Sequence, residues 1–235
     1  MTAPTHSENG SAQVDMAVFL RDLVHELANP LNSLSMNVEI LQTLVRRSGE
    51  AQAAAAIERL YQDQVCLDHL LRSLRTYAAA WEKPSRESIG LQDLVEEAGA
   101  AMRHDAAPPA AVVVVADGTS RLGIGRTPGI CAVAAILRNA AEAGASRVAV
   151  TMQAAAGKTC LIFDDDGPGI DERMRARVLD AFFTSRRDEA HFGLGLSTAR
   201  AVARAHGGDI EIGKSPSGGA RVLFAIRDPD EPSAK

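Results

Sequence analysis

The segment of this chain best equipped for chemistry is a histidine followed by an acid, an amide and a proline. Glu26 directly follows His25, and Asn29 and Pro30 stand four and five positions after the histidine. A carboxylate beside an imidazole can accept the proton of one ring nitrogen and sharpen the other nitrogen as a nucleophile. The amide, one helical turn away, can orient a water molecule or a phosphoryl oxygen. A lone helical histidine would indicate a solvated surface residue, but these neighbours favour a reactive one.

The histidine lies in a stretch with helical periodicity. Apolar residues recur there at three- and four-residue steps, as in a buried helical stripe, at Leu20, Leu23, Val24, Leu27, Leu31, Leu34, Val38, Leu41 and Val45. His25 is outside this stripe, so we expect it on a polar face that solvent reaches. Pro30 lacks an N–H, which removes the helical hydrogen bond to the carbonyl of Glu26 and bends the helix there.

Two long helices must present this face. The first is expected from about Val14 to Arg47 and the second from about Ala51 to Trp81, with a break at Ser48-Gly49. Helices joined by so short a turn form an antiparallel hairpin. One hairpin cannot bury the apolar stripes of both helices, whereas a second copy can complete a four-helix bundle. The pattern favours a homodimer; packing of the hairpin on the rest of its own chain is the alternative.

Beyond a linker signal at Lys83-Pro84-Ser85, the pattern changes to mixed helix and strand. Helices are expected over Leu91–Met102, Thr127–Ala143, Met174–Phe182 and Ser197–Ala205, and strands over Ala111–Ala116, Arg147–Met152, Thr159–Phe163, Ile210–Ile212 and Arg221–Ile226. Intermixed elements with terminal hairpins predict a two-layer α+β sandwich after the helical hairpin. The expected domains are a disordered N-terminus (1–12), the hairpin (13–82), a linker (83–90), the sandwich (91–228) and a flexible tail (229–235).

One loop of the sandwich has the residue types of a base-binding site. Asp164–Asp166 end a strand and are followed by Gly167 and Gly169. An acid there can accept a hydrogen bond from an exocyclic amine, and glycines let the backbone approach a flat ring closely. A calcium loop is excluded because the twelfth position, counted from Asp164, is Arg175 rather than a glutamate. A dinucleotide fingerprint is excluded because no third glycine opens a helix.

A second loop, Gly193-Leu194-Gly195-Leu196, precedes a predicted helix. Helix N-termini offer free N–H groups and a favourable dipole to phosphate, although a Gly-x-Gly alone is a weak signal. Asn139 lies in an apolar helix, where an amide is unexpected. It can be a cap or a core amide, or it can coordinate a metal ion through its carbonyl oxygen.

Taken in order, these segments resemble the two-component sensor histidine kinases. The run His25–Leu31 is similar to the phospho-acceptor box of that family, His-Glu-x-x-(Thr or Asn)-Pro-Leu. The later segments follow the order of its ATP-binding domain, with Asn139, Asp165-x-Gly167-x-Gly169, Phe182–Arg186, Gly193–Leu196 and His206–Gly208. The resemblance extends from about Val14 to Arg227 and implies the Bergerat fold, which gyrase, Hsp90 and MutL share.

For the nucleotide, the resemblance implies ATP with Mg²⁺. Asp165 would bind the adenine amine, and Asn139 would coordinate the Mg²⁺ that bridges the phosphates. The first glycine pair would shape the adenine pocket, and the second would lie against the phosphates, beside a lid from about Phe183 to His191. The implied nucleotide-binding residues are Asn139, Asp165, Gly167, Gly169, Thr184, Gly193, Leu194, Gly195 and Leu196.

For the transfer, the resemblance implies that His25 takes the γ-phosphoryl group and passes it to an aspartate of a response regulator. Glu26 would be the general base, and Asn29 would serve the reverse, phosphatase direction. The implied partners are a second copy of the chain, the receiver domain of the regulator and an upstream sensory protein. Neither the input signal nor the identity of the regulator follows from the residues.

Two positions depart from the family pattern. Ala135 stands where the family usually has a second amide, and His191 stands where it has a glycine. These changes predict weaker Mg-ATP binding and a stiffer lid. They also keep open a second function, a phosphotransfer scaffold that relays phosphoryl groups from a partner. Because gyrase and its closest relatives place a glutamate at the position of Ala135 to activate water, an ATP-hydrolysing machine is disfavoured.

Bulk composition excludes other classes. A net charge of −5 and an aromatic content of 4% argue against nucleic-acid binding. The cysteines, Cys66, Cys131 and Cys160, lack metal-ligand spacing and indicate reduced core residues. Residues 1–13 do not have the pattern of a signal peptide, and no window reaches the ~18–20 apolar residues of a membrane span. We therefore expect a cytoplasmic protein.

Overall fold

The structure, a computed structural model, describes scattered positions between Val24 and Thr43 and then residues 51–80, 87–102, 111–115, 120–155, 157–184 and 192–228. These residues belong to two compact units, one of Met1–Ala79 with Arg186–Phe192 and the other of Ala80–Ser185 with Gly193–Lys235. The described residues up to Ala79 are helical, and the second unit combines helices with strands.

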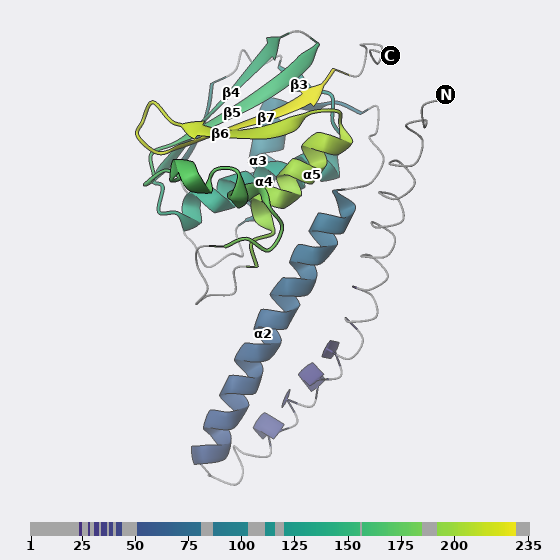
Figure 1. Cartoon of the computed structure of the whole chain (residues 1–235). Coiled ribbons are helices and arrows are strands. Elements are labelled where there is room, and N and C mark those ends of the chain that lie inside the picture. Colours follow the sequence, from purple (N-terminus) through teal and green to yellow (C-terminus); the bar gives the residue numbers. More distant parts are fainter. Residues whose placement is uncertain are drawn as a thin grey trace, which may run out of the picture. The chain divides into compact units, whose positions relative to one another are not determined.

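The first unit contains a 29-residue helix, α2 (Ala51–Ala79) (Figure 1). It confirms the second predicted helix, although α2 ends at Ala79 rather than Trp81. The described positions between Val24 and Thr43 are helical, in agreement with the first predicted helix. Several predictions concern segments outside the described residues: His25, Glu26, Asn29, Pro30, the break at Ser48-Gly49, the linker signal at Lys83–Ser85 and both termini.

Apolar side chains of this unit divide into a buried and an exposed set. The buried ones are Val24, Val38, Ile57, Leu71 and Leu74. The exposed ones are Leu34, Met36, Leu41, Leu60, Tyr61 and Leu67. Residues of the predicted apolar stripes are therefore found in both sets. Leu34, Leu41, Leu60 and Leu67 are not covered by other residues of the same chain. Among the described residues, no helix combines the length and apolar character needed to cross a membrane.

The second unit is built on a five-stranded sheet with the order β2-β4-β5-β7-β6 (Figure 1). The strands are β2 (Ala111–Val115), β4 (Arg147–Ala155), β5 (Lys158–Asp165), β6 (Asp209–Lys214) and β7 (Ala220–Arg227). Strand β2 runs parallel to β4, and all other neighbours are antiparallel. The five strands correspond to the predicted ones, and the β4–β5 and β6–β7 pairs are the two expected hairpins.

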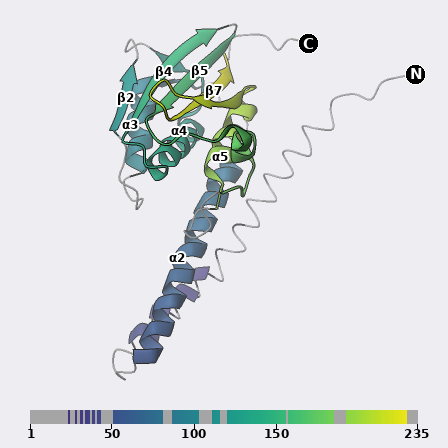
Figure 2. The ribbon, with the colours of Figure 1, turned by 60° about the vertical axis from the view of Figure 1, so that its left-hand side comes forward.

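Helices α3 (Leu91–Ala101), α4 (Arg126–Glu142) and α5 (Gly195–Ala205) cover one face of the sheet (Figures 1 and 2). The strands alternate between faces, so Leu161 and Phe163 of β5 and Phe224 of β7 point into the core and are fully buried. The predicted two-layer α+β sandwich of the Bergerat type is confirmed. The core lies between the sheet and the three helices.

Two short strands were not predicted. β1 (Ile89–Gly90) and β3 (Arg121–Leu122) form a two-stranded antiparallel sheet. Strands of this length are too short for alternation to distinguish them from a loop. Their pairing buries Ile89 and Leu122 and leads into α3 and α4, respectively.

The helix predicted over Met174–Phe182 is wrong. The structure has two single turns of 3₁₀ helix there, η1 (Glu172–Met174) and η2 (Arg177–Leu179). The Asp171 side chain accepts the Arg173 N–H at 2.8 Å and starts the first turn. Phe182 adopts a left-handed φ of +64°, which an α-helix cannot include. Helix α5 also begins two residues before its predicted start at Ser197.

Candidate nucleotide-binding site

Three consecutive aspartates at the end of β5 point in different directions. Asp164 lies opposite Arg221 of β7 and accepts two hydrogen bonds of 2.7 Å from its guanidinium. This hydrogen bonding raises the pKa of Arg221. Asp166 accepts the Ser146 hydroxyl at 2.5 Å and the Arg147 N–H at 2.9 Å, and these bonds lower the pKa of Asp166. The two outer carboxylates therefore tie the end of β5 to both neighbouring strands.

The middle carboxylate, Asp165, continues the inward-facing positions of β5 and is only 7% exposed. Its Oδ1 accepts the N–H groups of Gly167 and Ala220, both at 2.9 Å. Within the described residues, Oδ2 has no hydrogen-bond partner. A carboxylate oxygen with free lone pairs at the rim of a core is suited to accept the amine of a base.

The loop after Asp165 approaches closely enough to require glycine. A Cβ built on Gly167 would lie 3.1 Å from Asp165 Oδ1. Gly169 has a left-handed φ of +78°, and a Cβ there would lie 3.3 Å from the carbonyl oxygen of Gly219. Gly167 therefore lies beside the Asp165 carboxylate, and Gly169 lies beside the backbone of Gly219; their role in an adenine pocket stays a prediction.

Asn139 lies on helix α4. Asn139 is half-buried, and its side-chain amide makes no hydrogen bond within the described residues. Ala135 lies one turn earlier on the same face and is buried. A Cβ built on Gly195, the first residue of α5, would lie 3.8 Å from the Ala135 carbonyl oxygen. Ala135 therefore lies beside the start of α5, and Asn139 follows one turn later on α4.

The first turn of α5 offers unpaired backbone donors. Leu194 precedes the helix, and the first N–H that its carbonyl accepts is that of Thr198, at 3.0 Å. The N–H groups of Gly195, Leu196 and Ser197 have no partner within the helix. The side chains of Leu194 and Leu196 are buried, so these residues face a ligand only through their backbone. Free N–H groups and the helix dipole together favour an anion at this point.

The two ends of the predicted lid are joined by a hydrogen bond. The Phe182 N–H donates to the Gly193 carbonyl at 3.1 Å. Gly193 has a φ of +63°, and a Cβ there would lie 2.3 Å from the Phe183 carbonyl oxygen. Thr184 follows as a half-buried residue, whereas 185–191 lie outside the described residues. Only glycine fits at 193, so this position fixes how the chain enters α5.

Comparisons with known proteins match both units. Residues 15–80 match the family described as "His Kinase A (phospho-acceptor) domain". Residues 131–230 match the family described as "Histidine kinase-, DNA gyrase B-, and HSP90-like ATPase". The chain belongs to the two-component histidine kinases.

The relatives are sensor kinases. The signal transduction histidine-protein kinase AfsQ2 of Streptomyces coelicolor is 28% identical over 92% of this chain and 42% of its own length. The crystal structure of the ATP binding domain of PrrB from Mycobacterium tuberculosis is 26% identical, with a TM-score of 0.50, over 61% of this chain and 97% of that domain. Full-length ShkA in complex with AMPPNP shares the fold, with a TM-score of 0.63 and 23% identity, over 88% of this chain and 45% of that one. The chain thus spans less than half the length of curated relatives such as AfsQ2.

The metal expected in a histidine kinase would have few protein ligands here. Among the described residues, no group of three or more His, Cys, Asp or Glu side chains is placed to hold a metal ion. Mg²⁺ commonly binds through one protein oxygen together with phosphates and waters. The Asn139 amide, which has no hydrogen-bond partner among the described residues and lies one turn from Ala135, has the chemistry of such a ligand, whereas Ala135 contributes none.

Two residues that lie beside the Asp165 carboxylate, Gly219 and Ala220, were missed by the sequence analysis. The Ser215–Gly219 segment indicated only a hairpin turn, yet Ala220 donates to Asp165 and Gly219 contacts the same carboxylate. A signal was available in the Gly218-Gly219 pair, because two glycines at the end of a turn suit a close approach to another backbone. The sequence did not indicate that the backbone approached is that of Asp165, at the end of β5.

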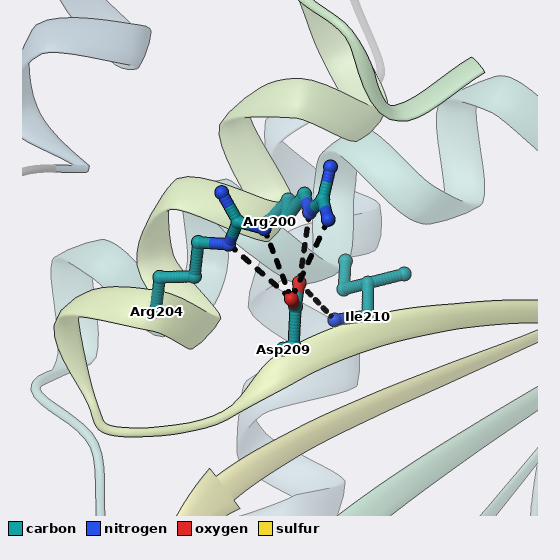
Figure 3. Close-up of polar contacts among 4 residues, drawn as sticks. All are labelled: Arg200, Arg204, Asp209 and Ile210. Carbon is teal, nitrogen blue, oxygen red and sulfur yellow. Dashed lines mark hydrogen bonds and ion pairs between the residues drawn. The ribbon is translucent and has the colours of Figure 1, made fainter. Parts of the chain in front are cut away.

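The far end of α5 is anchored to β6 by charge. Asp209 accepts hydrogen bonds from Arg200 Nε at 2.8 Å, from Arg204 and from the Ile210 N–H (Figure 3). Burial acts to raise the pKa of Asp209, but these hydrogen bonds outweigh it and lower the pKa to about 2. The cluster holds the C-terminal turns of the helix whose N-terminus faces the site.

Proposed function

We propose that this histidine kinase transfers the γ-phosphoryl group of ATP to His25 and then passes it to an aspartate on the receiver domain of a response regulator. The observation that carries the proposal is the Asp165 carboxylate, whose Oδ1 accepts two backbone N–H groups while Oδ2 has no hydrogen-bond partner among the described residues. Asn139 and the unpaired N–H groups of α5 support a polyphosphate site in the same unit.

In the proposed transfer, a ring nitrogen of His25 attacks the γ-phosphorus of ATP. A P–N bond forms while the P–O bond to the bridging oxygen breaks, and ADP leaves with that electron pair. Glu26 accepts the imidazole proton. In the second step, a carboxylate oxygen of the regulator attacks the same phosphorus, the P–N bond breaks, and His25 regains a proton. Asn29 would orient the water that later hydrolyses the regulator's aspartyl phosphate.

Each expected nucleotide residue has a proposed contribution. Oδ2 of Asp165 accepts the adenine amine, and the loop containing Gly167 and Gly169 flanks the ring. The backbone N–H groups that follow Leu194 contact phosphate oxygens, with Gly193 and Gly195 permitting the approach. Thr184, which follows Phe182 and Phe183 in the chain, would contact the phosphates from the side of the Phe182–Gly193 hydrogen bond opposite α5. Mg²⁺, when bound, neutralises charge on the phosphates, and Asn139 would hold it.

A homodimer in the cytoplasm is the proposed state of the chain. The apolar side chains of the first unit that remain exposed, such as Leu34, Met36 and Leu60, would be covered by the hairpin of a second copy. The cytoplasm supplies both ATP and the receiver domain. The sensory partner is also part of the proposal, since a signal must reach the hairpin.

A second candidate function rests on Ala135. Without an amide there, the site has one metal ligand fewer than its relatives, and the chain could act as a phosphotransfer scaffold that receives phosphoryl groups from a partner. The two functions differ in the source of the phosphoryl group. A kinase acquires it from ATP alone, whereas a scaffold requires a phosphorylated donor protein.

Incubation of the purified chain with γ-labelled ATP and Mg²⁺ separates these functions. The proposal expects an acid-labile, base-stable label on the wild type, with no label on His25→Gln or Asp165→Asn. The Gly99→Ala variant, altered in α3 where a Cβ has open space, is the control and should label normally. Label that survives His25→Gln contradicts the proposed acceptor, and label appearing only with a phosphorylated donor protein supports the scaffold instead.

A further inference from the structure

The hairpin turn between β6 and β7 closes on the base end of the site. We infer that Gly219 and the Asp164–Arg221 ion pair are positioning residues that fix the Asp165 carboxylate and so set selectivity for adenine over a 6-oxo purine. The inference rests on the proposed nucleotide site and adds the device that orients its base-reading group. None of the three residues need touch the nucleotide.

Gly219 lies against the Asp165 carboxylate with no space for a side chain. A Cβ built on it would lie 2.1 Å from Asp165 Oδ1, 2.5 Å from the Asp165 carbonyl oxygen and 2.7 Å from the Gly167 nitrogen. These separations leave no room for a side chain, and two of the obstructing atoms are backbone. Any larger residue must push the carboxylate or the hairpin aside. By contrast, a Cβ built on Gly99 of α3 would have nothing within 4 Å, so that position accepts a methyl group.

The Asp164–Arg221 ion pair fixes the register between β5 and β7, and this register places Gly219 beside the Asp165 carboxylate. Asp164 and Arg221 face each other as the last cross-strand pair of the β5–β7 ladder. Directly beyond it, the Ala220 N–H donates to the Asp165 side chain at 2.9 Å. The two guanidinium bonds of 2.7 Å hold β7 against β5 at this step. A slip of the hairpin would therefore remove the Ala220 donor from Oδ1.

Fixing Oδ1 determines what Oδ2 can recognise. With Oδ1 accepting two N–H groups, the carboxylate cannot rotate without breaking both bonds, so Oδ2 keeps one direction. A carboxylate oxygen accepts hydrogen bonds and donates none. It therefore suits the 6-amino group of adenine and repels the 6-oxygen of hypoxanthine or guanine. A site built around one required donor rejects analogues that lack it far more strongly than a flexible site does.

The test measures Mg-ATP and Mg-ITP affinities of the full chain by calorimetry, because ITP carries an oxygen in place of the 6-amino group. For the wild type we expect ATP to bind at least about tenfold more tightly. Gly219→Ala should weaken ATP at least about tenfold and ITP less than about threefold, so the ratio approaches one. Gly99→Ala, the glycine control, should leave both affinities and the ratio unchanged.

If a thermal melt shows that Gly219→Ala does not fold, variants of the Asp164–Arg221 ion pair give a second measurement of the ATP-to-ITP ratio. Arg221→Gln and Asp164→Asn should each lower the ATP-to-ITP ratio by about threefold or more, and the charge exchange Asp164→Arg with Arg221→Asp should restore it. If ATP and ITP affinities fall together in every folded variant, the residues are merely structural and the inference is wrong. If Asp165→Asn itself leaves ATP binding unchanged, the proposed nucleotide site fails instead.

Discussion

The two ends of the proposed nucleotide site are built from different groups. At the base end, Asp165 is a side-chain acceptor held in place by N–H groups from the loop after β5 and from the start of β7. At the phosphate end, α5 offers backbone N–H groups and α4 offers a single amide, Asn139. Selectivity thus depends on a fixed acceptor, whereas phosphate binding depends on charge that the ligand and its metal bring with them. Substitutions at the base end and at the phosphate end should therefore have separable effects on nucleotide affinity.

The largest difference between the effect on phosphate binding and the effect on base binding is expected for Gly193→Ala. The new methyl group would meet the Phe183 backbone at 2.3 Å in a left-handed backbone conformation, which disturbs the entry into α5. ATP and ADP affinities should fall at least about tenfold, while adenosine affinity stays within about twofold. Gly144→Ala is the control, because Gly144 has a φ of +88° and open space around its Cβ. Equal losses for adenosine and ATP would show that the ends are not separable.

A smaller, metal-dependent effect is expected from Asn139→Ala. Loss of the amide should weaken ATP binding about tenfold in Mg²⁺ and leave it nearly unchanged in EDTA, because the amide acts through the metal. Calorimetric titrations with and without Mg²⁺ measure the difference. The ATP-to-ITP ratio should not move, since the base end is untouched. A loss of equal size in EDTA would indicate a direct contact to phosphate or base instead.

The smallest effect is expected at the opposite end of α5. Asp209→Asn should lower the free energy of unfolding near pH 7 by about 1 kcal/mol or less, because the carboxylate is 44% exposed. The pKa of Asp209 is lowered from 3.8 to about 2 on folding, so its contribution is full above about pH 5 and is lost as the pH falls toward 2.

Urea unfolding of the wild type and of Asp209→Asn, from pH 7 down to pH 2, measures this contribution. The difference in stability between the two should stay constant above about pH 5 and shrink below pH 4. ATP affinity at pH 7 should be the same for both proteins. A difference that grows as the pH falls would mean that Asp209 is not the titrating group.

How much the sequence revealed depends on whether a signal is local. The long apolar periodicity of α2 and the alternation of β5 and β7 predicted these elements within a few residues. The order of Asn139, Asp165 and the glycines predicted the family, which the comparisons confirm, whereas the assignment of these residues to a nucleotide site stays a prediction. The segment Met174–Phe182 misled because its apolar spacing suits a helix, while a side-chain cap at Asp171 and the left-handed Phe182 break it into turns.

What stayed hidden from the sequence was the pairing between distant segments. Asp164 and Asp166 differ from Asp165 only by alternation along a strand, yet their partners lie on β7 and at the start of β4. Register, which decides those partners, is set by the whole sheet and not by any short run of residues. For the same reason Gly219 could be seen as a turn residue but not as the neighbour of a carboxylate.

The hydrogen bond between Phe182 and Gly193 has a consequence for variation among related chains. Because this bond joins the two sides of the intervening loop, the length of the loop is uncoupled from the position of α5. Lengthening such a loop adds only closure entropy, about 0.6 kcal/mol per doubling. Insertions and deletions between these two positions should therefore accumulate without disturbing the phosphate end, which leaves this loop open to divergence while its anchors stay fixed.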